Sequence, residues 1–178
     1  VFSQWFPDHN VPRQDHPFCN NANAAIRRAL WEEHPYDENI PALEDLAWAD
    51  WAQRQGHQIV YVSEAEVIHA HNETWQGVYN RYRREGMAFK KIYPEAHFNL
   101  ADFSRLFTVN VIHDMQEMRK QNRNVRTLNE ILQFRRAQFW GTYQGYKQAS
   151  RPLTMQLKQT FYYPTGKSLS GKANHRNV

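Results

Sequence analysis

Apolar side chains at helical spacing run through most of the second half of the chain, and this periodicity constrains the fold more than any other feature. The stripes fall on residues 75–94, 100–120 and 127–146. Apolar residues that recur every three or four positions line one face of a helix, which another element must cover. The pattern therefore predicts three long helices that share a core. The predicted core residues are Trp75, Val78, Tyr79, Tyr82, Phe89, Tyr93, Leu100, Phe103, Phe107, Val111, Met115, Met118, Leu128, Ile131, Leu132 and Phe139.

Two local patterns fall on the third of these segments. Thr127 and Glu130 have the Thr-x-x-Glu spacing of a capping box, so we expect the helix to begin beside Thr127. Gly141 and Gly145 lie one turn apart, and a helix face without side chains allows a second helix to approach closely. The residues around these glycines are too polar for the membrane form of this motif.

Two shorter helices are predicted in the first half of the chain. Asn23 is placed to cap a helix over residues 24–33. After Pro41, which suits a first helical turn, an apolar pattern predicts a second helix that stops at Gly56.

Short strands are predicted on either side of that second helix. The β-branched runs at 58–62 and 65–68 read as two consecutive strands, and residues 18–21 read as another. His69 and His71 follow the last run and would point the same way if the strand continued. A His-x-His pair can supply imidazoles to a divalent metal. The alternative is a pair of half-exposed histidines at the end of a strand.

An acidic pair opens the helix that follows Pro41. Glu44 and Asp45 fall near its N-terminus, where the helix dipole favours ionised carboxylates. Acidic residues also occur at helix starts without any further role, so the pair alone does not identify a site.

Composition and charge set broader limits. The length of 178 residues suits one domain or part of one, and the single cysteine, Cys19, excludes an internal disulfide. No run of about 18 apolar residues occurs, so nothing is expected to span a bilayer. Charge is uneven: residues 1–80 hold 4 Lys and Arg against 12 Asp and Glu, whereas residues 81–178 hold 18 against 6.

Taken in chain order, several motifs resemble the second half of the catalytic domain of inverting family 2 glycosyltransferases with the GT-A fold, especially bacterial rhamnosyltransferase-like members. The motifs are Asn23-Ala24-Ala25-Ile26-Arg27-Arg28, Tyr36-Asp37-Glu38, Glu44-Asp45 heading a helix with Trp48, the Gly-x-x-Ile-Val-Tyr-Val segment that begins at Gly56, and Val67-Ile68-His69-x-His71-Asn72.

The resemblance implies an α/β fold. Residues 1–74 would be the C-terminal half of a GT-A (Rossmann-like) domain with short strands, on the acceptor and catalytic side. Residues 75–160 would be a helical extension, and residues 161–178 a basic, disordered tail. Such enzymes bind the nucleotide with an N-terminal half that carries an Asp-x-Asp motif, which this chain lacks, and the chain begins with Val1. We therefore expect a piece of a longer protein that is inactive alone.

The resemblance also assigns roles to residues. Asp45 would be the catalytic base, and Glu44, Trp48 and Asn23 would bind the acceptor. His69, with His71 in reserve, would bind a divalent metal, Mg or Mn, whose main Asp-x-Asp ligand lies outside this chain. The expected reaction moves a sugar from a nucleotide-sugar donor to a glycan or lipid-linked glycan acceptor with inversion, in cell-surface polysaccharide synthesis. A cytoplasmic location follows, with peripheral contact between the basic half and an anionic inner membrane face as one interpretation of its charge. The alternative is a set of solvated helix faces that the acidic first half partly balances.

Two other classes of function stay open at this stage. A basic nucleic-acid-binding module would fit a pI of about 9.2, although no known nucleic-acid motif occurs and the aromatic residues fall on helix stripes. Stacking residues exposed beside arginines would favour that class. A small metal hydrolase built on His69, His71 and a carboxylate would need a third ligand from within the chain.

Overall fold

The computed structural model describes residues 6–68, 74–121 and 125–162. Within these ranges the secondary structure is helical, without a β-sheet. The helices are α2 (Arg28–Glu33), α3 (Glu44–Arg54), α4 (Trp75–Ile92), α5 (Leu100–Lys120), α6 (Val125–Gln148) and α7 (Met155–Tyr162).

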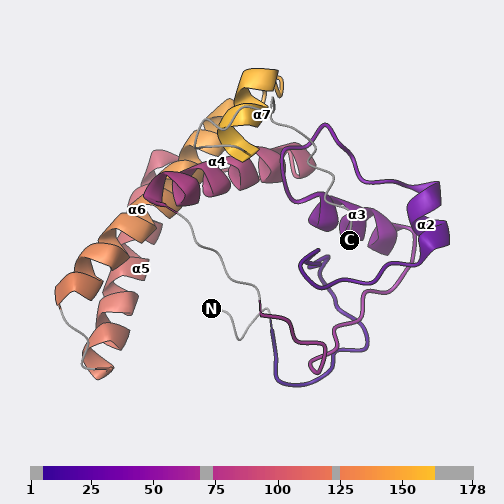
Figure 1. Ribbon diagram of the computed structural model, residues 1–178, viewed down its shortest axis with the longest axis horizontal. Helices are drawn as coiled ribbons and strands as arrows, with labels where there is room; N and C mark the ends of the chain where they lie inside the picture. The colour runs from indigo at the N-terminus through magenta and orange to yellow at the C-terminus, as the bar shows by residue number, and fades with distance from the viewer. Residues whose placement is uncertain (1–5, 69–73, 122–124, 163–178) are drawn as a thin grey trace, which may run out of the picture.

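Three long helices form one part of the molecule, and a loop-rich segment with α2 and α3 forms the other (Figure 1). Helix α6 packs against both α4 and α5, and α7 lies on α4. The loop-rich segment meets the C-terminal end of α4, where the Tyr93 hydroxyl donates to Asp50 Oδ1 at 3.4 Å and Lys91 Nζ donates to the Asn39 carbonyl at 3.5 Å. None of the described helices has the length and apolarity needed to cross a membrane.

Three glycines hold the backbones of α4 and α6 in direct contact. A Cβ on Gly141 would lie 2.6 Å from the Tyr79 carbonyl oxygen, and one on Gly86 would lie 2.8 Å from the Thr142 carbonyl oxygen. A Cβ on Gly145 would overlap the Arg83 carbonyl oxygen. The predicted close approach at Gly141 and Gly145 is confirmed. Gly86 supplies the matching space on the opposite helix.

The side chains around these glycines form the core of the helical part. Met87 and Ala88 are fully buried on α4, and Val78 and Phe139 are buried beside them. Met87 lies against Gly145, because a Cβ on that glycine would stand 2.9 Å from the Met87 backbone nitrogen. Small residues thus set the distance between the helices, and the larger apolar groups fill the space that remains.

Polar side chains fix the positions of α5 and α7 against the pair formed by α4 and α6. Arg135 of α6 forms a two-pronged ion pair with Asp114 of α5, at 2.6 and 2.9 Å, and both side chains are largely buried. On the other side, the buried Asn80 donates to the Thr160 carbonyl at 3.3 Å, and the Arg83 guanidinium lies over the ring of Phe161. Helix α7 is therefore anchored through α4.

The predicted long helices are confirmed, with differences at their ends. Helix α5 has the predicted bounds, and Asn99 and Asp102 form a true capping box at its start. The capping box predicted at Thr127 is wrong, because α6 begins at Val125 and Thr127 is already inside the first turn. The sequence did not predict α7, which crosses the expected boundary at residue 160.

Some predicted core positions face solvent. Leu100 is 54% exposed, and Trp75 is 42% exposed, although both continue their apolar stripes. Each is the first residue of its helix. In the middle of the stripe on α5, Val111 is buried as predicted.

The predicted α/β fold, with residues 1–74 as half of a Rossmann-like GT-A domain, is wrong for the described residues. The runs at 58–62 and 65–68, and residues 18–21, are not strands; the pairing is a single bridge between Val11 and Tyr61. A β-branched run needs a partner strand, and the segment alongside this one contains Pro12, which has no N–H to donate.

The exposure of this segment agrees with the absence of a sheet. Val60 and Val62 are 55% and 46% exposed, and no second layer covers them within the described ranges. The helix predicted over 24–33 is also shorter than expected. It begins at Arg28, with Arg27 at the N-cap position, so Asn23 does not cap it.

We expect Gly145→Ala to lower the free energy of unfolding by about 1–3 kcal/mol, because the added methyl group meets backbone atoms that cannot rotate away. Helix propensity alone predicts a gain in the free energy of unfolding of up to about 1 kcal/mol for the same change. The sign of the measured change therefore shows whether the steric collision or the helix propensity dominates. Urea denaturation followed by circular dichroism measures it. Gln116→Ala, at an exposed position of α5, should change stability by less than about 0.5 kcal/mol. Unchanged or higher stability of Gly145→Ala would show that the helices can separate at no cost.

Candidate functional site at the start of helix α3

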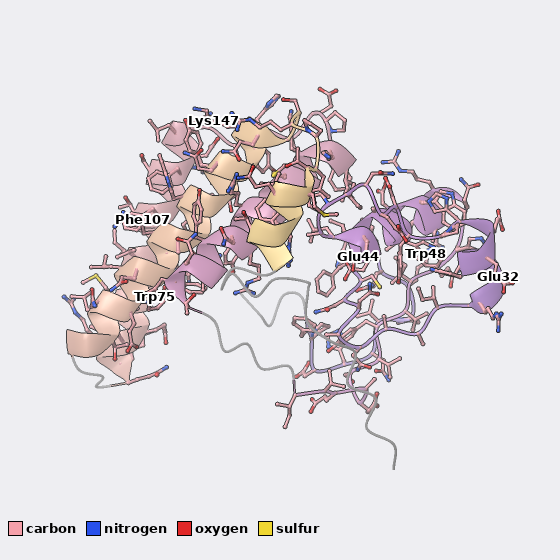
Figure 2. All side chains as sticks on the ribbon, turned by 45° about the horizontal axis from the view of Figure 1, so that its top comes forward. Glu32, Glu44, Trp48, Trp75, Phe107 and Lys147 are labelled. Carbon is pink, nitrogen blue, oxygen red and sulfur yellow. The ribbon has the colours of Figure 1, made fainter. Side chains whose placement is uncertain are left out.

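The backbone that leads into α3 is strained. Leu43, the N-cap residue, has φ 59° and ψ 29°, which is the left-handed region. Among the described residues, no other non-glycine residue has a positive φ. Such a conformation costs on the order of 1–3 kcal/mol and persists only where the surroundings fix it. It turns the chain so that Glu44 and Asp45 occupy the first two positions of the helix. Figure 2 shows Glu44 and Trp48 on α3.

Both carboxylate oxygens of Asp45 accept backbone hydrogen bonds. The N–H of Leu46 donates to Oδ1 at 2.8 Å, and the N–H of Asn21 donates to Oδ2 at 2.9 Å. The second bond links α3 to a loop 24 residues earlier in the chain. The carboxylate is thereby fixed in position at the positive end of a helix.

Asn21 organises both acidic side chains. Its backbone N–H binds Asp45, and its side-chain Nδ2 donates to Glu44 Oε1 at 3.1 Å. The hydroxyl of Tyr36 donates to the Asn21 Oδ1 at 2.9 Å, which orients the amide. A loop asparagine, a tyrosine and two carboxylates thus form one hydrogen-bonded cluster.

Burial sets the ionisation behaviour of this cluster. Burial raises the pKa of the Asp45 carboxyl above its ordinary value, against the lowering effect of the hydrogen bonds from Asn21 and Leu46; the charge of Glu44 adds to the rise. Burial and then the nearby Asp45 raise the pKa of the Cys19 thiol, so this thiol stays protonated and unreactive. Burial also raises the pKa of Tyr36, which keeps its hydroxyl as a donor.

Trp48 and Asn23 lie near the cluster and serve its framework. Trp48 is 7% exposed, and its indole N–H donates to the His34 carbonyl at 2.7 Å. Its ring contacts that of Tyr36 edge-on, with 6.5 Å between centroids. The side-chain amide of Asn23 donates to the Ala65 carbonyl, which ties the loop to a later segment. The acceptor-binding role predicted for these two residues stays a prediction.

The predicted metal ligands are not part of the described site. His69 and His71 lie outside the described residues. Within the described ranges, no group of three or more His, Cys, Asp or Glu side chains could hold a metal ion. Glu44 and Asp45 are bonded to Asn21 instead, so the residues in view do not form a metal centre.

The cluster has the chemistry of a proton acceptor. A carboxylate offers about four lone-pair directions, and two of those on Asp45 are occupied by the N–H groups of Asn21 and Leu46. A raised pKa brings the group closer to neutral pH, where a general base works best. Glu44 stands beside it as a second acceptor.

The prediction from sequence identified both acids but missed the groups that hold them. Tyr36 was part of a recognised motif without a role, and Asn21 had none. The run Asn20-Asn21-Ala22-Asn23 contains three asparagines, and the sequence does not distinguish which of them bonds to α3. The structure shows that it is Asn21.

Comparison with known proteins adds one relationship. No family model matches the chain, and no solved structure matches it. The chain is 34% identical over 71 residues to the O-antigen chain rhamnosyltransferase of Salmonella typhimurium. The matched region is 39% of this chain and spans 23% of that protein.

The raised pKa of Asp45 predicts a specific pH dependence. The folded protein holds this proton more tightly than the unfolded chain, so the associated stability is present in acid and is lost as pH rises through the folded pKa. Asp45→Asn should therefore become progressively more stable relative to the wild type as pH rises above about 4, the ordinary pKa of an aspartate carboxyl. Urea titrations at several pH values measure this trend.

Asp8→Asn is the matched control. A hydrogen bond from His9 lowers the pKa of the exposed Asp8, so this variant should lose relative stability as pH rises, the opposite sign. A flat difference between Asp45→Asn and the wild type would contradict the assignment of a buried, proton-retaining carboxyl.

Proposed function

We propose that this chain takes part in glycosyl transfer to a glycan acceptor during the synthesis of a cell-surface polysaccharide. The observation that carries the proposal is the half-buried Asp45 carboxylate, fixed by Asn21 beside Glu44 and raised in pKa. The similarity to an O-antigen rhamnosyltransferase supports the reaction class. A nucleotide-linked rhamnose is the donor that this similarity favours.

Asp45 acts as the base in this proposal. An acceptor hydroxyl is a weak nucleophile, and its attack on the anomeric carbon requires removal of its proton as the bond forms. The oxygen–carbon bond to the acceptor forms as the bond to the nucleoside diphosphate breaks, and the hydroxyl proton passes to Asp45. Direct displacement of this kind inverts the anomeric centre. Glu44, held by Asn21, accepts a hydrogen bond from a neighbouring acceptor hydroxyl.

A divalent metal is part of the proposal on sequence grounds alone. The His-x-His pattern of His69 and His71 is its support, and such an ion would neutralise charge on the departing diphosphate. The described residues do not supply its ligands, so no step at Asp45 depends on it.

Asp45→Asn in the native protein should reduce sugar transfer by about 10²–10⁴-fold, because the amide keeps the shape of the side chain but cannot accept the proton. Transfer of labelled rhamnose to an O-antigen acceptor measures the rate, and calorimetry measures donor affinity, which should be unchanged. Asp8→Asn, an exposed change outside the cluster, should transfer normally. Near-normal transfer by Asp45→Asn would remove Asp45 from the reaction.

The charge of the second half extends the proposal to an anionic membrane surface. Residues 81–178 carry a net charge of +12, and each Lys or Arg held near such a surface contributes on the order of 1 kcal/mol. We expect the protein to sediment with vesicles that contain anionic lipid, to be released as salt rises, and to leave neutral vesicles unbound. Equal binding to both kinds of vesicle, or none, would contradict membrane contact.

A further inference from the structure

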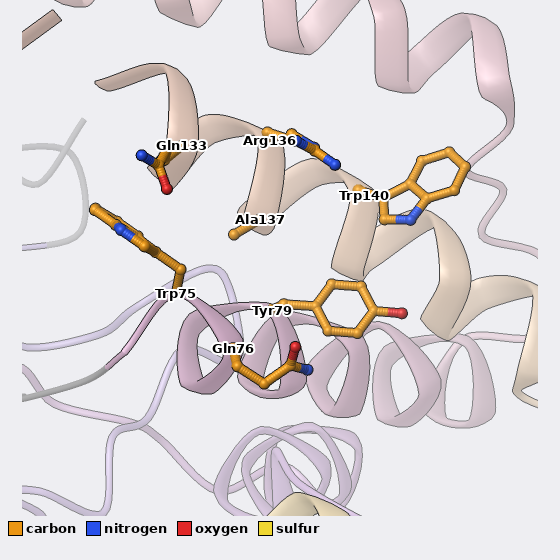
Figure 3. Close-up of a pocket in the computed structure, with 7 residues that line it drawn as sticks. All are labelled: Trp75, Gln76, Tyr79, Gln133, Arg136, Ala137 and Trp140. Carbon is orange, nitrogen blue, oxygen red and sulfur yellow. The ribbon is translucent and has the colours of Figure 1, made fainter. Parts of the chain in front are cut away.

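A cavity of about 310 Å³ opens between α4 and α6, away from the Asp45 cluster (Figure 3). Trp75, Gln76 and Tyr79 line it from α4. The residues from α6 are Gln133, Arg136, Ala137 and Trp140. Its volume lies at the lower end of the range of about 300–1,000 Å³ that small-molecule sites occupy.

Three aromatic rings form the apolar part of this cavity, and two of them are unusually exposed. Trp75 is 42% exposed and Trp140 is 38% exposed. Trp140 is nevertheless held firmly, since it packs edge-on against Phe103 of α5 at 5.5 Å and against Tyr143 at 5.2 Å between centroids. An exposed indole whose orientation is fixed by its neighbours can stack against the flat face of a ligand.

The polar groups in the cavity are mostly neutral. Gln76 uses its Nε2 to bind Asn80 at 3.1 Å, which leaves its Oε1 as an acceptor. The side chains of Gln133 and Arg136 make no hydrogen bond or ion pair within the part of the chain that the structure describes. Among the lining residues Arg136 is charged and none is acidic. The site therefore offers aromatic faces, two amides and one guanidinium.

We propose that this cavity binds a neutral oligosaccharide, as a subsite for the part of the acceptor glycan remote from the reacting hydroxyl. The assignment of the ligand as acceptor rests on the proposed function. The C–H groups on one face of a sugar ring stack on the electron-rich face of an indole, while amides and a guanidinium hydrogen-bond the hydroxyls at its edge. Both kinds of contact are present in this cavity.

The alternatives fit the same residues less well. Single-stranded nucleic acid would also stack on exposed aromatics, but it needs a groove with several cations that follow its backbone, and this cavity has Arg136 alone. A nucleoside diphosphate likewise requires more positive charge. Neutral amides in place of those cations favour a ligand rich in hydroxyl groups.

Direct binding to the full chain tests the proposal. The probe is a neutral oligosaccharide released from a rhamnose-containing O-antigen, followed by calorimetry and by saturation-transfer NMR. Trp75→Ala should weaken binding by about tenfold or more. Trp31→Ala is the matched control, because this indole on α2 is also 42% exposed but lies outside the cavity, and it should leave binding unchanged.

Further variants separate binding from folding. Trp140→Phe keeps an aromatic ring on Phe103 and should retain most of the affinity, whereas Gln133→Ala should weaken it without disturbing a packed side chain. Circular dichroism confirms the fold of each variant. Absence of oligosaccharide binding, or equal loss in Trp75→Ala and Trp31→Ala, would overturn the proposal. Tighter binding of dTDP, UDP or a single-stranded oligonucleotide at this cavity would overturn it too.

The outcome is independent of the proposed transfer reaction. Oligosaccharide binding that depends on Trp75, in a protein with no sugar transfer, would reject the transferase and retain the glycan site. Transfer with an acceptor KM that Trp75→Ala leaves unchanged would reject the subsite and retain the transferase.

Discussion

The backbone contact between α4 and α6 is the constraint on which the helical part depends. Gly86, Gly141 and Gly145 bring main-chain atoms together where any side chain would collide. At this separation, packing leaves little room for alternative registers, because a shift of one residue would put a larger side chain against a carbonyl group. The ion pair between Arg135 and Asp114 then fixes α5 on the same frame. Strong helix–helix complementarity thus replaces a large apolar core.

The site at α3 depends on a different kind of constraint. The left-handed conformation of Leu43 is unfavourable, and the hydrogen bonds of Asn21 to Glu44 and Asp45 hold the chain in the turn that requires it. Burial disfavours the charge on Asp45, yet the backbone donors keep its carboxyl in place. Strain and unfavourable burial at one place are typical of positions kept for function rather than stability.

The sequence predicted the long helices because their periodicity is a local property, repeated over many turns. It failed for the sheet because a strand depends on its partner. Among the described residues, the β-branched run at 58–62 pairs with only the short, proline-interrupted segment at Val11. Glu44 and Asp45 were predicted as site residues from the resemblance to family 2 glycosyltransferases, because their position at a helix start does not identify a site by itself. Asn21 was missed because its bonds to Glu44 and Asp45 span 23 and 24 residues, separations that no local pattern encodes. Trp75 was assigned to the core because a stripe shows its direction but not how closely a neighbouring helix covers each residue on it.

Helix α4 connects the two candidate sites. Its first turns line the aromatic cavity, and its last residues contact the segment that carries α3. An α-helix of 18 residues is about 27 Å long, so a ligand in the cavity reaches the neighbourhood of Asp45 only if it is an extended chain of sugars. Binding energy gained far from the reacting group can orient that group and so lower the barrier to reaction. A rigid spacer suits the proposed function, because any change in its length would move the proposed acceptor hydroxyl away from Asp45. In the proposed function, the glycines that hold α4 against α6 would therefore affect the reaction as well as the stability, because they fix the helix that separates the two candidate sites.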